Sequence, residues 1–430
     1  MRRSVLSALP ILLFALFVWL LKPLDAQAAS GKVIYTFRGG ADGAYPYSDL
    51  AIDAAGNLYG TTSDGGVGCG GYGCGTVYEL LRTKDGWSHQ VLYRFTASSA
   101  DGVNPLTGVI FDSSGNLYGT TSSGGKFECG TVFKLAPNSS GSWKESILHS
   151  FDCNADGMRP NGDLVFDGQG NLYGTTFEGG TGTGFCGGDE SGFFGCGTAF
   201  KLSPNSGGWW TNTTIYNFQG SPDASSPIGA LVPDGKGGFY GASEYGGTGA
   251  CSTGHGVYDP PDGCSAVFEL MPSGTGWTET VIYSFFRGRG FARNPSGGFI
   301  VGGSTLLLGT SWDGGNGFGT FFQLKQTGKA WNQSILHRFY GNPDGRTPLG
   351  RLASGPQNTW FGVTVSGGTS RDGTVFALEQ TKAGWGEHVL YNFDSTSFPQ
   401  AGPVVDSQGH VYGTTLEGGK GLGTVYEVIP

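Results

Sequence analysis

Charged residues are scarce in this sequence, and positive charge is the scarcer kind. Only 14% of the 430 residues are charged, and 25 Lys and Arg residues face 34 Asp and Glu residues, for a formal net charge of −9. An acidic chain without a basic stripe is a poor partner for nucleic acid or anionic lipid. Beyond residue 28, no apolar run is long enough to cross a bilayer. We therefore expect no nucleic-acid partner and no membrane span in the mature chain.

Catalytic signatures and helical periodicity are missing as well. No GxSxG, HExxH or EF-hand pattern occurs. Of the six His residues, His149 and His337 replace the Tyr of a repeated strand motif, so we expect them to be sheet residues, and the other four share no repeat position. No stretch after residue 28 shows a helical period. These absences favour an all-β protein and disfavour an enzyme.

The first 28 residues have the pattern of a secretory signal peptide. Arg2 and Arg3 precede an apolar run over 5–21, and the small residues "AQA" follow at 26–28. An uncleaved membrane anchor is the alternative, but the run is short for a span. Residues 29–430 then form the mature domain, with a charge of 22 − 33 = −11 and no C-terminal anchor after "TVYEVIP". We expect a soluble, monomeric protein secreted by a bacterium, either extracellular or periplasmic.

Glycine is abundant and belongs to an internal repeat. The chain has 81 Gly residues without the three-residue period of collagen, and 13% aromatic residues argue against disorder. The phrase "GNLYGTT" stands at 56, 115 and 170, with diverged copies at 237, 305, 358 and 409. Each copy lies between a segment opened by Pro and two further runs of strand length, such as "GTVFKL" and "VLYRF". We name these four runs strands A to D, with A after the Pro and B at the phrase. Four strands per unit are typical of a propeller blade.

The two ends of the chain complement each other. Six D strands are preceded by a Trp, and the seventh, residues 33–37, opens the mature chain, whereas the last unit ends after its strand C at 423–428. Pairing these two segments would complete the last blade and remove exposed strand edges. The sequence therefore predicts a seven-bladed β-propeller with four antiparallel strands per blade, closed by the N-terminal strand. An open β-solenoid or another blade count is the alternative.

We interpret "GNLYGTT" as scaffold. Its second Gly lies inside a strand, where Gly usually marks the close approach of another backbone, here that of a neighbouring strand or blade. The rival interpretation, a phosphate-binding loop, requires a helix and a Lys-Ser or Lys-Thr pair, which do not follow. The second residue after each Pro is also small, as expected where seven inner strands crowd around one axis. These residues are Ser48, Thr107, Gly162, Gly229, Gly297, Gly350 and Ala401.

The eight Cys residues indicate disulfides, because the protein is expected to be exported. Three pairs lie within one B–C loop each, and the fourth joins a B–C loop to the D–A connection of the same blade, which emerges on the same face. The predicted bridges are Cys69–Cys74, Cys186–Cys196, Cys251–Cys264 and Cys129–Cys153. Zinc binding is the rival, but these spacings lack a His pair, so we predict no metal site here.

Two sets of polar residues are candidate binding residues. The first set occupies the D–A connections: Asp42, Asp101, Asp156, Asp223 and Asp344. A ring of such carboxylates could hold Ca²⁺ or meet sugar hydroxyls, although Asp-Gly before Pro is also an ordinary turn. The second set, Asp49, Asp163 and Arg351, lies three residues after a repeated Pro and could line an axial site. The six strand-D Trp residues could stack on sugars, but their regular placement favours packing between or along blades.

Seven copies of "GNLYGTT…GG…GTVFKL…W…VLYxF" over residues 33–430 closely resemble the GloVer (Gloeo/Verruco) tandem repeat of bacterial exported, choice-of-anchor proteins. The resemblance implies export and a repeat-built surface protein. It carries no established activity and no catalytic residues.

The sequence thus favours a secreted binding module that recognises a glycan or a protein with the loops on one face. A structural cell-surface interaction protein is one alternative. A glycan lyase or hydrolase with an axial active site is the other. We expect no cofactor other than the Ca²⁺ considered above.

Overall fold

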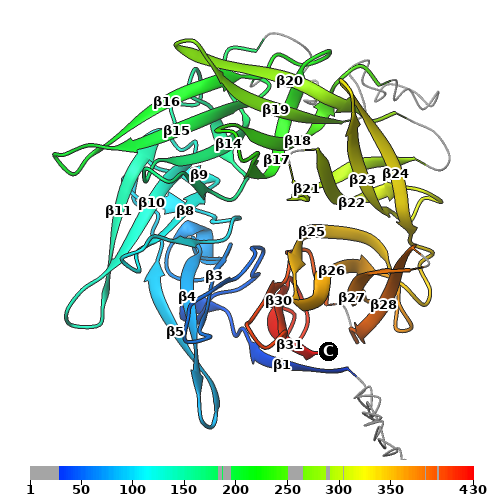
Figure 1. Ribbon diagram of the computed structural model, residues 1–430. Coiled ribbons are helices and arrows are strands. Elements are labelled where there is room, and N and C mark those ends of the chain that lie inside the picture. The colour runs from blue at the N-terminus through cyan, green and yellow to red at the C-terminus, as the bar shows by residue number, and fades with distance from the viewer. Residues whose placement is uncertain are drawn as a thin grey trace, which may run out of the picture.

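The strands form seven antiparallel sheets arranged in a ring (Figure 1). The computed structural model describes residues 29–182, 186, 195–249, 265–286, 291–303, 305–382, 384–394 and 397–430. The helical elements within these ranges are three short 3-10 turns, η1 (Gly40–Asp42), η2 (Cys69–Gly71) and η3 (Pro356–Asn358). The predicted all-β, seven-bladed propeller is therefore confirmed.

Blades 1 to 3 come from the first part of the chain. Their strands run outward from the axis in chain order. Blade 1 contains β2 (Ala51–Ile52), β3 (Leu58–Thr62), β4 (Thr76–Thr83) and β5 (Gly86–Arg94). Blade 2 contains β7 (Ile110–Phe111), β8 (Leu117–Thr121), β10 (Thr131–Pro137) and β11 (Trp143–Ser150), and a separate pair joins β6 (Gly102–Val103) to β9 (Ser123–Gly124). Blade 3 contains β12 (Met158–Pro160), β13 (Val165–Phe166), β14 (Leu172–Glu178), β15 (Thr198–Pro204) and β16 (Trp210–Asn217).

Blades 4 to 6 have longer inner strands. Blade 4 contains β17 (Ala224–Pro233), β18 (Phe239–Gly246), β19 (Ala266–Ser273) and β20 (Gly276–Ser284). Blade 5 contains β21 (Ala292–Val301), β22 (Leu306–Gly314), β23 (Thr320–Thr327) and β24 (Ala330–Arg338). Blade 6 contains β25 (Arg346–Ser354), β26 (Thr359–Ser366), β27 (Thr374–Thr381) and β28 (Gly384–Asn392).

Blade 7 is built from both ends of the chain. It contains β29 (Val404–Val405), β30 (Val411–Thr415), β31 (Thr424–Ile429) and, on its outer edge, β1 (Ser30–Thr36). Val33 is paired with Tyr426 and Tyr35 with Val425, and a bulge separates the two pairs. The predicted closure is therefore confirmed, and Figure 1 shows β1 beside β31.

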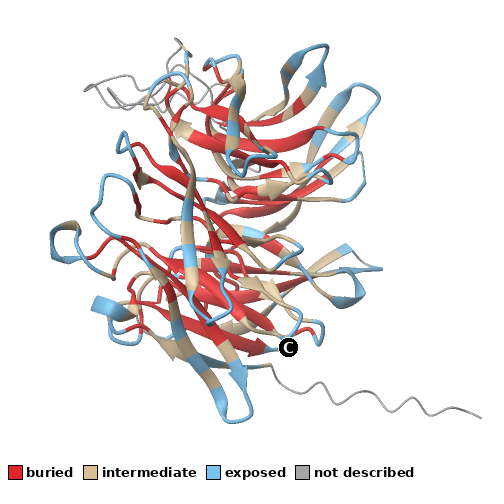
Figure 2. Ribbon diagram, turned by 90° about the vertical axis from the view of Figure 1, so that its left-hand side faces the viewer, coloured by how far each residue is buried: buried red, intermediate tan, exposed pale blue. Residues whose placement is uncertain are grey.

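The core lies between neighbouring blades. Seven clusters of buried apolar residues each combine side chains from two adjacent blades. The strand-D Trp residues contribute to this packing. Trp87 contacts Tyr412 with ring centroids 5.7 Å apart, and Trp331 contacts Tyr240 at 5.8 Å, each across a blade boundary. These Trp side chains therefore pack between blades, as expected. Figure 2 shows buried residues within the strands and exposed residues at the loop tips.

The glycine inside strand B makes room for a ring. Gly174 is paired with Phe200 on strand C, and a Cβ added to Gly174 would lie 2.6 Å from the Phe200 ring. Gly119 stands in the same relation to Phe133. The expectation that the close neighbour is backbone is wrong, because an aromatic side chain occupies the space. The phrase "GNLYGTT" is scaffold, as predicted.

Candidate axial pocket and blade interfaces

The inner strands enclose a pocket on the axis with a volume of about 260 Å³. Each unit contributes lining residues from the three positions that follow its repeated Pro. The side chains that give the pocket its chemistry are Tyr47, Asp49, Asn161, Asp163, Arg351 and Gln400. The walls also contain small residues, because the inner strands approach one another closely. A Cβ added to Gly350, for example, would lie 2.3 Å from the Gly402 backbone nitrogen of the adjoining blade.

A repeated backbone turn directs these residues toward the axis. The residue before each repeated Pro has a left-handed φ of 46–59°, namely Tyr45, Asn104, Arg159, Ser226, Asn294, Thr347 and Phe398. Non-Gly residues rarely adopt this conformation, so the surrounding structure must hold it. The N–H of Asn104 donates to the Cys74 carbonyl at 2.9 Å, and that of Ser226 donates to the Cys196 carbonyl at 2.8 Å. These bonds fix the start of the inner strand to the beginning of strand C in the preceding blade.

The pocket brings together the three axial residues that the sequence singled out. An Arg351 Nη2 atom lies 3.7 Å from Asp49 Oδ2. The backbone N–H of Gly402 donates to Asp49 Oδ1, and that of Gly108 donates to Asp163 Oδ1 at 2.8 Å. Burial and the neighbouring Asp163 raise the pKa of Asp49 to about 7, although Arg351 and the Gly402 N–H oppose the shift. The pocket therefore holds two carboxylates with different environments and one guanidinium.

The five D–A aspartates lie in five separate connections, and each forms hydrogen bonds with the strand D before it and with the backbone of its own connection. Each is hydrogen-bonded to a Tyr or His seven or eight residues earlier in strand D and accepts from at least one nearby backbone N–H. Asp223, for example, accepts from the Tyr216 hydroxyl at 2.9 Å and from the Gln219 N–H at 2.8 Å. This arrangement is the one expected of a turn. His149 and His337 lie in β11 and β24, as predicted, and hydrogen-bond to Asp156 and Asp344.

Three of the four predicted disulfides are confirmed: Cys69–Cys74, Cys129–Cys153 and Cys186–Cys196. The predicted Cys251–Cys264 bridge lies outside the described residues. The Cys129–Cys153 bridge supports the strand order, since it joins a B–C loop to a D–A connection.

Exposed aromatic side chains gather at the end of the propeller that carries the B–C and D–A loops. Of the twelve exposed large hydrophobic residues in the described part of the chain, nine lie in these loops or at the strand ends beside them. They are Tyr47, Val67, Tyr72, Phe127, Phe286, Phe291, Trp312, Tyr340 and Phe398. Tyr72 is 78% exposed, and Phe286 and Phe291 contact each other with centroids 4.5 Å apart. We call these nine residues the loop-face cluster.

The blade interfaces contain titratable residues that sequence reasoning missed. Two residues after each strand-D Trp stands a polar residue: His89, Glu145, Asn212, Glu279, Gln333 or Glu387. Where this residue is Glu, it faces a D–A aspartate of the preceding connection. Burial and Asp101 raise the pKa of Glu145 to about 7, and burial and Asp223 raise that of Glu279. Their regular spacing from Trp could have marked them as one repeated position. Sequence alone, however, predicts that an acidic residue in an outer strand faces solvent, because its burial depends on the neighbouring blade.

Comparison with known proteins defines the family. The Gloeobacter/Verrucomicrobia repeat model matches residues 23–256 and 256–430, so the chain belongs to this repeat family. No curated protein matches the sequence. Within the described ranges, no helix is sufficiently long and apolar to traverse a membrane.

Solved structures share the fold at low sequence identity. A fungal alcohol oxidase of the AA5 family in complex with copper matches with a TM-score of 0.54 at 11% identity, covering 93% of this chain and 76% of that one. A protein from Lactobacillus plantarum matches with a TM-score of 0.51 at 11% identity, covering 85% and 89%. A gluconolactonase from Xanthomonas campestris matches with a TM-score of 0.40 at 11% identity, covering 74% and 83%. At this identity the first two likenesses show the fold alone.

Proposed function

We propose that the protein is an exported binding module that recognises glycans through the loop-face cluster and the axial pocket. The single observation that carries this proposal is the concentration of exposed aromatic side chains on one face. Solvent-exposed aromatic rings gathered on one surface mark interaction sites, since water contact with them is unfavourable. The disulfides Cys69–Cys74, Cys129–Cys153 and Cys186–Cys196 hold loops of this face.

The chemistry of the pocket favours a hydroxylated ligand. Asp49 and Asp163 accept hydrogen bonds, Arg351 donates them, and the amides of Asn161 and Gln400 do both. These groups line a volume of about 260 Å³, which suits one or two sugar rings rather than a folded protein element. Tyr47, which is exposed and lines the pocket, connects the polar pocket to the aromatic face.

A glycan array with the mature chain tests this proposal. Tyr72→Ala and Tyr47→Ala each remove an exposed ring from the loop-face cluster, and we expect at least tenfold weaker binding to the ligand found. Trp209→Ala is the matched control, because Trp209 is 66% exposed but lies in a C–D hairpin at the opposite end of the strands. Equal losses in all three variants, or capture of proteins without any glycan, would contradict glycan recognition.

A second candidate function is acid–base chemistry on a glycan in the same pocket. The observation in its favour is that Asp49 has a pKa near 7 whereas Asp163 lies beside it with a backbone donor of its own. Two carboxylates in different environments can supply an acid and a base. Turnover of a lyase or hydrolase substrate that persists on repurification and disappears in Asp163→Asn, with binding retained, would favour this function over pure recognition.

A further inference from the structure

Every described blade interface except the seam between blades 6 and 7 has a buried polar atom without a hydrogen-bond partner at one repeated position. These atoms are His89 Nε2, Glu145 Oε1, Asn212 Oδ1, Glu279 Oε1, Gln333 Nε2 and Glu387 Oε1. A buried polar atom without a partner costs about 1–3 kcal/mol, so native proteins satisfy such atoms with small polar species. Chemically different side chains share this feature, and a buried water is the commonest species that satisfies such atoms in proteins. The repeated position is therefore a polar site between blades that a small polar species would satisfy.

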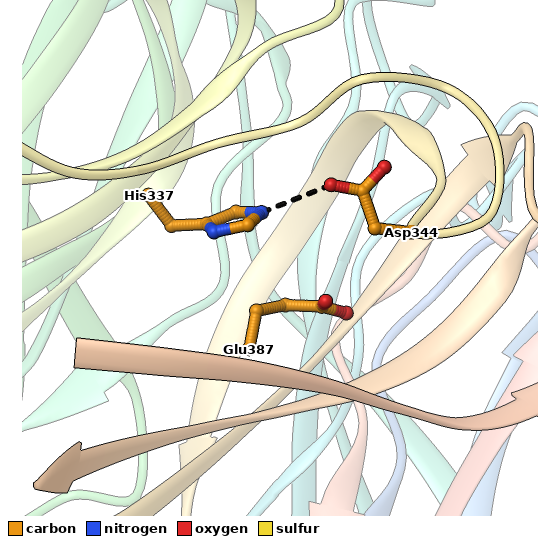
Figure 3. Close-up of side chains that lie close together, drawn as sticks. All are labelled: His337, Asp344 and Glu387. Atoms are coloured by element: carbon orange, nitrogen blue, oxygen red, sulfur yellow. Dashed lines mark hydrogen bonds and ion pairs between the residues drawn. The ribbon is translucent and has the colours of Figure 1, made fainter.

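Between blades 5 and 6, this repeated site has a distinct set of ligand atoms. His337 Nε2 lies 3.1 Å from Asp344 Oδ2, and ligand atoms of His337, Asp344 and Glu387 all lie within 4.8 Å of one another. No other trio of His, Cys, Asp or Glu in the described chain meets this condition. Figure 3 shows the imidazole directed at the Asp344 carboxylate, with Glu387 reaching alongside from the next blade.

We infer that His337, Asp344 and Glu387 form a binding site for a divalent transition-metal ion, best matched by Zn²⁺, that links blade 5 to blade 6. Imidazole nitrogen and carboxylate oxygen are both Zn²⁺ ligands, at about 2.0–2.2 Å. Two ligands that share an ion at that distance lie roughly 3 Å apart, which agrees with the 3.1 Å between His337 and Asp344. Three protein ligands leave a coordination position for water.

The electrostatics of the cluster support a cation rather than a water. Asp344 and Glu387 bring carboxylate oxygens to within 4.8 Å of one another, in a space largely shielded from solvent. A bound cation attracts both carboxylates, and its charge outweighs their mutual repulsion. The His337 side chain is 19% exposed and that of Asp344 is 11% exposed, so the site lies close enough to the surface for an ion to enter.

Sister interfaces supply matched controls within the same chain. Between blades 3 and 4 the trio is Tyr216, Asp223 and Glu279, which has both carboxyl groups but no imidazole. Between blades 2 and 3 His149 lies 2.7 Å from Asp156, but the third residue is Asn212 instead of Glu. Only the combination of all three groups distinguishes the proposed site from these two.

The test measures Zn²⁺ binding to the chelator-treated mature protein by equilibrium dialysis, with thermal unfolding as a second readout. We expect one Zn²⁺ per chain and a rise of several degrees in the unfolding temperature. His337→Tyr restores the residue of the sister strands and so keeps the hydrogen bond to Asp344; it is expected to fold and to weaken Zn²⁺ binding at least tenfold. Glu387→Gln should do the same. His149→Tyr and Glu279→Gln should retain full binding.

A gain of binding completes the design. Tyr216→His places an imidazole beside Asp223 and Glu279, and we expect the stoichiometry to rise from one Zn²⁺ to two. Mn²⁺ and Ca²⁺ in parallel define the ion class, and stronger binding of Ca²⁺ than of Zn²⁺ would overturn the assignment. Zn²⁺ binding that is unchanged in His337→Tyr identifies an adventitious ion only, and no binding in the unmodified protein shows that the cluster holds no Zn²⁺. Either result overturns the site.

Discussion

At the scale of single residues, the repeat keeps a glycine because of the residue on the paired strand. In strand B the Gly position faces an aromatic ring of strand C, as with Gly174 and Phe200. The ring covers the glycine and fills the space that a side chain would take. Sequence alone indicated that another group closely approaches this position. It could not distinguish a neighbouring backbone from a neighbouring aromatic ring, since either one excludes a Cβ.

Replacing this glycine should therefore destabilise the blade. In Gly174→Ala the new Cβ would lie 2.6 Å from Phe200 Cζ and 3.0 Å from Leu164 Cδ2. Overpacking of this kind costs about 1–3 kcal/mol. Denaturant unfolding measures the loss, and Gly168→Ala is the control, because a Cβ at Gly168 would have no atom within 4 Å. In the Gly174→Ala/Phe200→Leu double variant the two losses should be less than additive, and strict additivity would contradict the ring contact.

The interface glutamates should make stability fall as pH rises. Glu145 has an ordinary pKa of 4.5 when unfolded, and burial and Asp101 raise it to about 7 in the folded protein. The folded state therefore binds the proton more tightly between these values, and stability is lost as pH rises from about 4.5 to about 7. Glu145→Gln removes the ionisable group.

We expect Glu145→Gln to be more stable than the parent by about 1–2 kcal/mol at pH 8 and to differ little at pH 4. Thermal unfolding across this range measures the difference, and exposed Glu128→Gln is the control. A parent protein whose stability is flat from pH 4 to 8, relative to Glu145→Gln, would show that burial and Asp101 do not raise the pKa of Glu145 in the folded state.

At the scale of strands and loops, the repeat pattern predicted more than composition could. Four strands per unit, the order of those strands and three disulfides follow from motifs that recur in register, such as the Cys before strand C. The blade interfaces did not follow, because they depend on which residue of one unit faces which residue of the next. Glu279 and Asp223 are 56 residues apart in the chain and belong to different units, so no local pattern joins them.

The disulfide that closes the longer loop should stabilise the protein more. The Cys129–Cys153 bridge spans a sequence separation of 24 and the Cys69–Cys74 bridge one of 5. From loop-closure entropy, removing the longer bridge with paired Ala substitutions should cost about 3–4 kcal/mol and removing the shorter one about 2 kcal/mol. Calorimetry under non-reducing conditions measures both. A larger loss for the shorter loop would show that the Cys69–Cys74 bridge acts by fixing loop structure rather than by limiting the unfolded chain.

At the scale of the whole molecule, the ring depends on one pairing between the two chain ends. β1 covers the edge of β31 and contributes to the core with Ile34 and Tyr35. The axial pocket draws on all seven units, so closure of the ring also sets the pocket. The sequence predicted that Asp49, Asp163 and Arg351 would share this space, because they hold equivalent positions around one axis. It could not predict their electrostatics, which depend on the distances between units.

A circular permutant tests the closure directly. Ser30 is paired with Ile429, so joining Pro430 to residue 29 creates a two-residue hairpin, matching the two residues between the paired Thr83 and Gly86 in blade 1. Asn-Gly replaces those two residues, and the new termini lie in the exposed hairpin at 206–207. Strands C and D of blade 7 are then joined by a hairpin as in the other blades, and blade 3 becomes the blade that is built from both chain ends. Because no native pairing is lost, we expect the permutant to unfold within a few degrees of the parent.

Deletion of 29–37 removes the same strand without replacing it and leaves the β31 edge and its apolar side chains uncovered, so this variant should aggregate or unfold far below the parent. A deletion variant as stable as the parent would mean that β1 is an accessory to the ring rather than its closure.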